Sequence, residues 1–77
     1  MELQGFVSKF ASQFENTSES EFAADTRFRE LAEWDSLIAL SIIAMVDEEY
    51  DVTLAGDDIR HSATIEDLFR IVEAKKG

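Results

Sequence analysis

Ser36 is the residue of this 77-residue chain whose side chain is the best candidate for a chemical role. The chain has no cysteine and one histidine, His61, so it offers no thiol nucleophile and a single imidazole that could serve as a general base. The segment Glu33-Trp34-Asp35-Ser36-Leu37 also lacks the glycines of a nucleophile elbow. We interpret His61 as a helix-end or loop residue. The sequence therefore predicts no catalytic site and no enzyme.

A different chemistry is available to Ser36, because an apolar helical repeat starts directly after it. Free amide groups and the helix dipole stabilise a phosphate at a helix N-terminus. A serine there can carry a phosphodiester at the start of a rigid helix, with Leu37 beside the attached group. The alternative is structural, because Asp35 or Ser36 can simply cap the helix. The residues alone leave both interpretations open.

The elements around Ser36 follow from apolar spacing, which predicts helices and no strand. We expect one all-α domain over residues 1–77, a small four-helix bundle with three longer helices, one short third helix and a long loop between helices 1 and 2. The predicted segments are a helix at about 2–15, a connection at 16–35 with a short turn near 27–32, a helix from Asp35-Ser36 to Tyr50, a short helix from Asp57 to Arg60-His61, and a last helix capped by Thr64.

The predicted core consists of apolar stripes at helical spacing, together with anchors in the long connection. Its members are Leu3, Phe6, Val7, Phe10, Ala11, Phe14, Phe22, Phe28, Leu31, Trp34, Ala39, Ile42, Ile43, Val46, Tyr50, Ile65, Leu68, Phe69 and Val72.

The helix after Ser36 carries a second apolar face that this core does not need. Leu37, Leu40 and Ala44 fall opposite the core stripe on a helical wheel, bordered by Ser41 and Glu48. An apolar outer face on a small protein favours contact with a partner or ligand. The alternative is that the 16–35 connection folds over part of this face.

Acidic residues dominate the charge of the chain, which has a net charge of −10 from 17 acidic and 7 basic residues. Six of them gather within twelve residues, namely Asp47, Glu48, Glu49, Asp51, Asp57 and Asp58. Nucleic acids and anionic membrane surfaces are excluded as partners, and a partner with a basic docking surface is favoured. The alternative is a solvated acidic face.

Other classes of function find no support in the composition. No run of about 18 apolar residues is present, and the first ten residues lack the apolar core of a signal peptide, so we expect a cytoplasmic protein or one of an equivalent reducing space. We also expect a monomer. Calcium-loop spacing from Asp51 places Ala55 and Ser62 at ligand positions that need oxygen donors such as a carboxylate. We therefore expect no metal site.

In this context Asp35-Ser36-Leu37 resembles the phosphopantetheine attachment motif of acyl carrier proteins of the discrete, stand-alone type. The likeness spans essentially the whole chain. It continues from Trp34 through Tyr50, includes Ala55-Gly56-Asp57-Asp58-Ile59 as the family's short third helix, and ends with Ser62 to Leu68 as the entry to its last helix.

The resemblance implies that a transferase moves 4′-phosphopantetheine from coenzyme A to Ser36 with magnesium, assisted by Asp35. It implies cargo held as a thioester, and acyl-loading and acyl-processing enzymes as partners. Ile42, Ile43 and Val46 would line a core that opens around an acyl chain. Leu37, Ala44, Met45 and Glu48 match positions that usually meet partners. Together with the outer face and the acids, they give a predicted partner-binding set of Leu37, Leu40, Ser41, Ala44, Met45, Asp47, Glu48 and Glu49.

Three positions depart from the usual pattern of fatty-acid carriers. Glu33 stands where many have glycine, and Ile38 and Ser41 stand where many have acids. The start of the recognition helix is thus less acidic, which favours a specialised pathway, such as secondary metabolism or cell-surface polysaccharides, over central fatty-acid synthesis. The competing hypothesis is an unmodified acidic helical adaptor that binds a basic or apolar partner surface.

Overall fold

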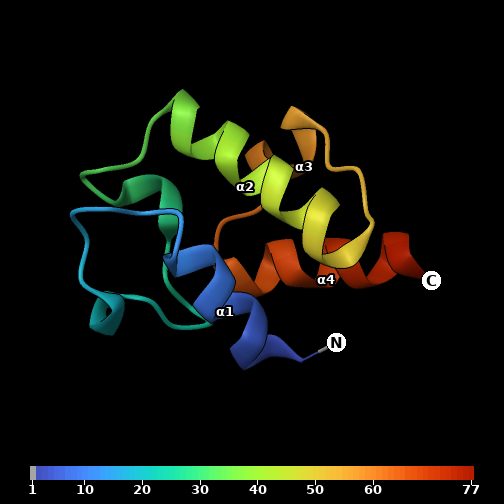
Figure 1. Cartoon of the computed structure of the whole chain (residues 1–77), viewed down its shortest axis with the longest axis horizontal. Helices are drawn as coiled ribbons and strands as arrows, with labels where there is room; N and C mark the ends of the chain where they lie inside the picture. Colours follow the sequence, from blue (N-terminus) through green and yellow to red (C-terminus); the bar gives the residue numbers. More distant parts are fainter. Residues whose placement is uncertain (1) are drawn as a thin grey trace.

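The computed structural model describes residues 2–77 as a helical fold in which α1, α2 and α4 enclose a common core (Figure 1). Helix α1 contacts α2 and α4, α2 contacts α4, and the short α3 packs on α4. No strand occurs among the described residues, so the expected all-α bundle is confirmed. The helices are α1 (Leu3–Ala11), α2 (Ser36–Tyr50), α3 (Gly56–Arg60) and α4 (Ile65–Lys76), with 3-10 turns η1 (Glu19–Glu21) and η2 (Phe28–Glu30).

Helix α1 is shorter than the predicted 2–15, because it ends at Ala11. Side chains at its end compete for the last backbone carbonyls. The Ser12 hydroxyl donates to the Lys9 carbonyl at 2.7 Å, and the Gln13 amide reaches the same oxygen at 3.3 Å. The chain then tightens into turns that still deliver Phe14 to the core, where it is buried.

The 16–35 connection is long but anchored, as its apolar residues predicted. Phe22 and Phe28 are buried, and Leu31 and Trp34 pack against the core. The expected turn near 27–32 is present as η2. The amides of Ile65 and Glu66 donate to carbonyls of this connection at 3.2 and 2.9 Å, which fastens it to the start of α4. The connection that leads to Ser36 is therefore anchored to the core and to the start of α4.

Helix α2 has the bounds that the sequence predicted, and it buries one side. Ile42, Val46 and Tyr50 are buried, while Ala39 and Ile43 are half-buried against the core. The helix ends at Tyr50, and its C-cap Asp51 adopts the left-handed conformation at φ 57°. None of the helices among residues 2–77 is both long and apolar enough to cross a membrane.

Helices α3 and α4 also begin where their acidic and capping residues predicted. The Asp58 carboxylate accepts from the Ala55 amide at 2.8 Å, at the start of α3. Thr64 and Asp67 form a reciprocal capping box, in which the Asp67 amide donates to the Thr64 hydroxyl at 3.1 Å. The expected inward stripe of Ile65, Leu68, Phe69 and Val72 is buried. These caps fix the starts of α3 and α4.

Candidate cofactor attachment site

Ser36 is the first residue of α2 and is exposed. The preceding residue, Asp35, is the N-cap, and its Oδ1 accepts from the Ile38 amide at 2.8 Å. The structure thus assigns to Asp35 the cap that the sequence left open between these two residues. The Ser36 hydroxyl is not used for capping, so it remains available on the surface at a helix N-terminus.

Glu33 ties the residues just before Ser36 to residues 15–17 of the loop that follows α1. Its carboxylate accepts from the Glu15 amide at 2.8 Å, the Asn16 amide at 3.0 Å and the Thr17 hydroxyl at 2.7 Å. The hydrogen bond from the Thr17 hydroxyl, followed by the one from the Glu15 amide, lowers the pKa of Glu33 from its ordinary 4.5. A glycine at this position would offer none of these acceptors.

Trp34 anchors the same approach from the core side. Its ring lies 5.0 Å from that of Phe28 in an edge-on arrangement and 6.4 Å from that of Phe14, centroid to centroid. Such aromatic pairs contribute about 0.5–1.5 kcal/mol beyond their buried area. The hydrogen bonds of Glu33 and the aromatic contacts of Trp34 therefore hold the residues immediately before Ser36 in place.

An apolar groove of about 350 Å³ lies beside Ser36, between α2 and α3. Its lining is Arg29, Trp34, Ser36, Ala39, Leu40, Ile43, Gly56, Ile59 and Arg60. Three residues were expected to line a core that opens around an acyl chain. Ile42 and Val46 are fully buried in that core on the inner side of α2, and Ile43 is half-buried against it and lines the groove.

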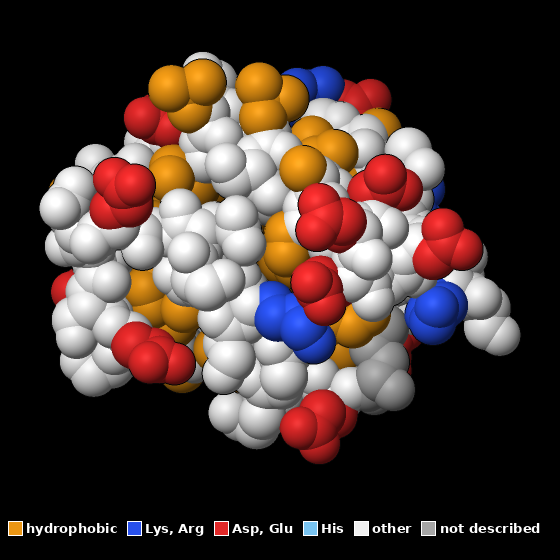
Figure 2. Space-filling model, in the orientation of Figure 1, with side chains coloured by type: hydrophobic (Ala, Val, Ile, Leu, Met, Phe, Trp, Pro, Cys, Tyr) orange, Lys and Arg blue, Asp and Glu red, His pale blue; other side chains and the backbone are white. Residues whose placement is uncertain are grey.

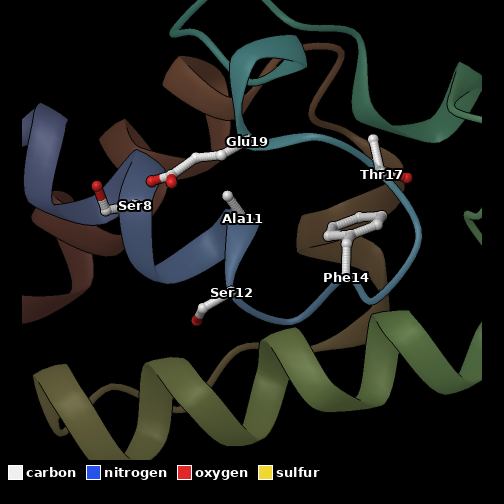
Figure 3. A pocket seen from close by; sticks show the side chains of 6 residues that line it. All are labelled: Ser8, Ala11, Ser12, Phe14, Thr17 and Glu19. Atoms are coloured by element: carbon white, nitrogen blue, oxygen red, sulfur yellow. The ribbon is translucent and has the colours of Figure 1, made fainter.

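A second hollow, of about 240 Å³, shares no lining residue with this groove (Figure 3). It lies between α1 and the following loop, and the Glu19 side chain extends over it toward Ser8. Its lining contains no residue of α2. His61 is the exposed C-cap of α3, as its interpretation as a helix-end residue predicted, and it does not line the groove beside Ser36.

Comparison with known proteins identifies the family of this chain. The model of the phosphopantetheine attachment site family matches residues 6–72, nearly the whole chain. The chain belongs to this family. No curated protein and no solved structure matches it significantly. Carriers of this family bear a covalently attached 4′-phosphopantetheine and interact with transferases and processing enzymes. Such carrier domains are generally not catalytic themselves.

The residues around Ser36 fit this cofactor. An attachment serine needs an accessible hydroxyl, and Ser36 is exposed with Asp35 doing the capping. The amides at the start of α2 suit a phosphate next to that hydroxyl. The groove begins at Ser36 and is mainly apolar, so a chain attached there has a surface along which to lie.

The outer face of α2 is as exposed in this carrier as its wheel predicted. Leu37 and Leu40 are 71% and 61% exposed, and Ala44 is exposed as well. Figure 2 shows hydrophobic side chains along the edge of the molecule formed by α2, with acidic side chains beside them. The 16–35 connection therefore does not cover Leu37 and Leu40, and that alternative is wrong.

Met45 departs from the predicted partner-binding set, because its side chain is buried in the core. It follows Ile42 by three residues and adjoins Val46, so it shares their inward side. The other members remain accessible: Ser41 is half-buried, and Asp47, Glu48 and Glu49 are exposed. Glu49 lies 4.0 Å from the Lys9 ammonium of α1, so it already has a partner within the chain.

Sequence reasoning missed two features of the site, the role of Glu33 and the presence of Arg29 and Arg60 at the groove. Glu33 meets residues 16 to 18 positions away, and Arg29 meets Ser62 across 33 positions. Helical periodicity cannot reveal such pairs. The one available signal was Glu33 itself, where many carriers have glycine.

Proposed function

We propose that Ser36 carries the 4′-phosphopantetheine arm of this carrier. The observation that supports the proposal most strongly is the free, exposed Ser36 hydroxyl at the start of α2, directly beside the apolar groove. The arm supplies a terminal thiol that holds an acyl, aminoacyl or polyketide cargo as a thioester. This chemistry suits a chain that has no cysteine of its own.

Attachment requires a transferase, coenzyme A and Mg²⁺. The Ser36 Oγ attacks the β-phosphorus of coenzyme A, the pyrophosphate bond breaks, and adenosine bisphosphate leaves. The proton of the hydroxyl passes to a base of the transferase. Asp35 uses Oδ1 to cap α2. We infer that its other carboxylate oxygen faces the transferase and its metal ion, which prefers carboxylate ligands.

The outer face of α2 is the proposed docking surface for these partners. Leu37, Leu40 and Ala44 form an exposed apolar ridge, bordered by Ser41 and followed by Asp47, Glu48 and Glu49. An apolar centre beside charges of one sign suits a partner with a complementary basic patch. We propose that the carrier works as a monomer and serves a specialised biosynthetic pathway.

The departure from the usual acids at the start of α2 supports that specialisation. Ile38 packs against the core rather than lying free on the surface, and Ser41 is half-buried. The acidic charge of the docking surface is thus confined to the second half of α2. Apart from its N-cap Asp35, the first turn of α2 offers no acid to a partner.

An intact-mass experiment tests the proposal against an unmodified adaptor. The purified chain is incubated with coenzyme A, Mg²⁺ and a broad-specificity transferase. We expect a gain of one phosphopantetheinyl group, absent in Ser36→Ala and retained in the matched control Ser8→Ala, which changes an exposed serine of α1 outside the docking surface. No gain with several competent transferases would overturn the carrier assignment to Ser36 and favour the adaptor.

A further inference from the structure

The groove beside Ser36 has a cationic rim on a strongly acidic protein. The two charged residues that line it are both arginines, Arg29 and Arg60, although acids outnumber bases in the chain by 17 to 7. The remaining lining is apolar apart from Ser36 and Gly56. A purely hydrocarbon cargo would have no use for this pair of charges.

Arg29 is held in position by a backbone carbonyl and not by a carboxylate, so no ion pair within the described part of the chain compensates its positive charge. Its Nε and Nη2 donate to the Ser62 carbonyl at 3.2 and 2.9 Å. Ser62 is itself fully buried and donates from its hydroxyl to the Asp58 carbonyl at 2.8 Å, so this anchor is firm. Among residues 2–77, Arg29 takes part in no ion pair, in contrast to Arg27, which pairs with Glu30. The Nη1 side of the Arg29 fork remains available to an anion.

Arg60 marks the same rim but is partly neutralised. It pairs with Asp57 on the neighbouring turn of α3. Its Nη1 lies 3.4 Å from the point where a Cβ on Gly56 would stand, so the guanidinium lies over the start of α3. The dominant uncompensated charge at the groove is therefore that of Arg29.

We propose that the groove selects a cargo with a short apolar stem and a terminal carboxylate, that is, a dicarboxylic type of acyl group. This inference rests on the proposed function and names the cargo class for the same site. The stem lies along Ala39, Ile43 and Ile59, and the carboxylate meets Arg29. A planar guanidinium held by one edge suits a carboxylate on its other edge.

A second anion, the phosphodiester next to Ser36, would share this chemistry. The amide groups at the start of α2 already suit a phosphate at that point. Arg29 belongs to η2 and not to α2, so it stands across the groove from the attachment helix. We therefore assign the cargo carboxylate to Arg29 and make the phosphodiester an outcome of the test.

The test uses the unmodified chain, so it can be read even if Ser36 is never loaded. Three probes are titrated while the amide NMR signals of Ile43, Gly56 and Ile59 are followed. The probes are glutaryl-pantetheine, pentanoyl-pantetheine of the same chain length, and phosphopantetheine without cargo. We expect the glutaryl probe to bind about three- to tenfold more tightly than the pentanoyl probe, as one charge-assisted contact allows. Raising the salt should shrink this difference, because exposed charges are screened.

Three variants separate the role of Arg29 from general charge. Arg29→Gln should abolish or reverse the preference, Arg29→Lys should keep part of it, and Arg27→Gln, two residues away and outside the groove, should leave it unchanged. Equal or tighter binding of the pentanoyl probe to the wild type would overturn the proposal. It would also fail if Arg29→Gln weakened phosphopantetheine as much as the glutaryl probe, or if neither acyl probe bound at about 10 mM, since a tethered arm supplies a millimolar effective concentration.

Discussion

Leu37→Ala should weaken docking while leaving the fold nearly intact, and Ile42→Ala should do the reverse. Leu37 is 71% exposed and Ile42 is fully buried, although both lie on α2. Full burial of a leucine stabilises by about 1.5–3 kcal/mol, so a partner that covers the exposed part of Leu37 gains about 1–2 kcal/mol. This corresponds to a loss of about 5- to 30-fold in kcat/KM for the transferase when Leu37 is truncated.

The contrast with Ile42 supplies the stability side of the same prediction. Truncating a fully buried isoleucine to alanine costs about 2–5 kcal/mol, which is a large share of the stability of so small a protein. Leu37→Ala should lower the free energy of unfolding by well under 1 kcal/mol, since most of its side chain already contacts solvent.

The assay measures transferase kcat/KM with coenzyme A and, separately, thermal unfolding by circular dichroism. Leu3→Ala serves as the matched control, because it removes the same atoms from a half-buried position on α1. Unchanged kcat/KM in Leu37→Ala, or an equal loss in Leu3→Ala, would refute the docking surface. A large drop in melting temperature in Leu37→Ala would refute its placement outside the core.

Three further predictions concern the stability of the fold. Asp51→Gly should stabilise by about 0.5–1.5 kcal/mol, or several degrees in melting temperature, because it relieves the left-handed backbone and removes an acid from the end of α2; a lower melting temperature would contradict this. Thr64→Ala should cost about 1 kcal/mol through loss of the α4 cap, measured by urea unfolding, and an unchanged midpoint would contradict the cap's contribution. A hydrogen bond from the Thr17 hydroxyl is the main cause that lowers the pKa of Glu33 below its ordinary 4.5, and one from the Thr64 amide is the main cause that lowers the pKa of Asp67 below its ordinary 3.8. The stability they provide is complete above these ordinary values and is lost as the pH falls through the lowered ones. Acid titration of unfolding should therefore show a steeper loss in the wild type than in Glu33→Gln, and equal profiles would count against the role of Glu33.

The parts of the fold that the sequence predicted well are those set by local rules. The start of α2 at Asp35-Ser36 and the capping box at Thr64 depend on neighbours within three residues, which can be read directly from the chain. The inward stripes follow from the helical repeat for the same reason. The exposed position of Leu37 and Leu40 also came from this repeat alone.

The errors arose where side chains compete for the backbone carbonyls of a helix, and where likeness to other carriers was preferred to the helical repeat of apolar residues. The end of α1 depends on Ser12 and Gln13 both reaching the Lys9 carbonyl, and apolar spacing does not register such contacts. Met45 was expected at the surface because similar carriers use that position for partners. Its spacing from Ile42 already indicated the core, and the structure agrees with the spacing.

The long-range contacts of the candidate site lay beyond sequence reasoning. Glu33 ties the residues just before Ser36 to the loop after α1, and Arg29 donates to the carbonyl of Ser62. Both depend on how the 16–35 connection is laid over the core. The composition predicted a partner with a basic surface, but it gave no sign that the groove itself would carry cations.

The most direct test of the central claim is to locate the modification within the chain. After treatment with transferase and coenzyme A, the protein is cleaved at glutamates and its peptides are fragmented in the mass spectrometer. We expect the phosphopantetheinyl group on the peptide that follows Glu33, with fragments placing it on Ser36 and leaving Ser41 unmodified. The chain has seven serines, so a group found on any other one would contradict the proposed attachment site.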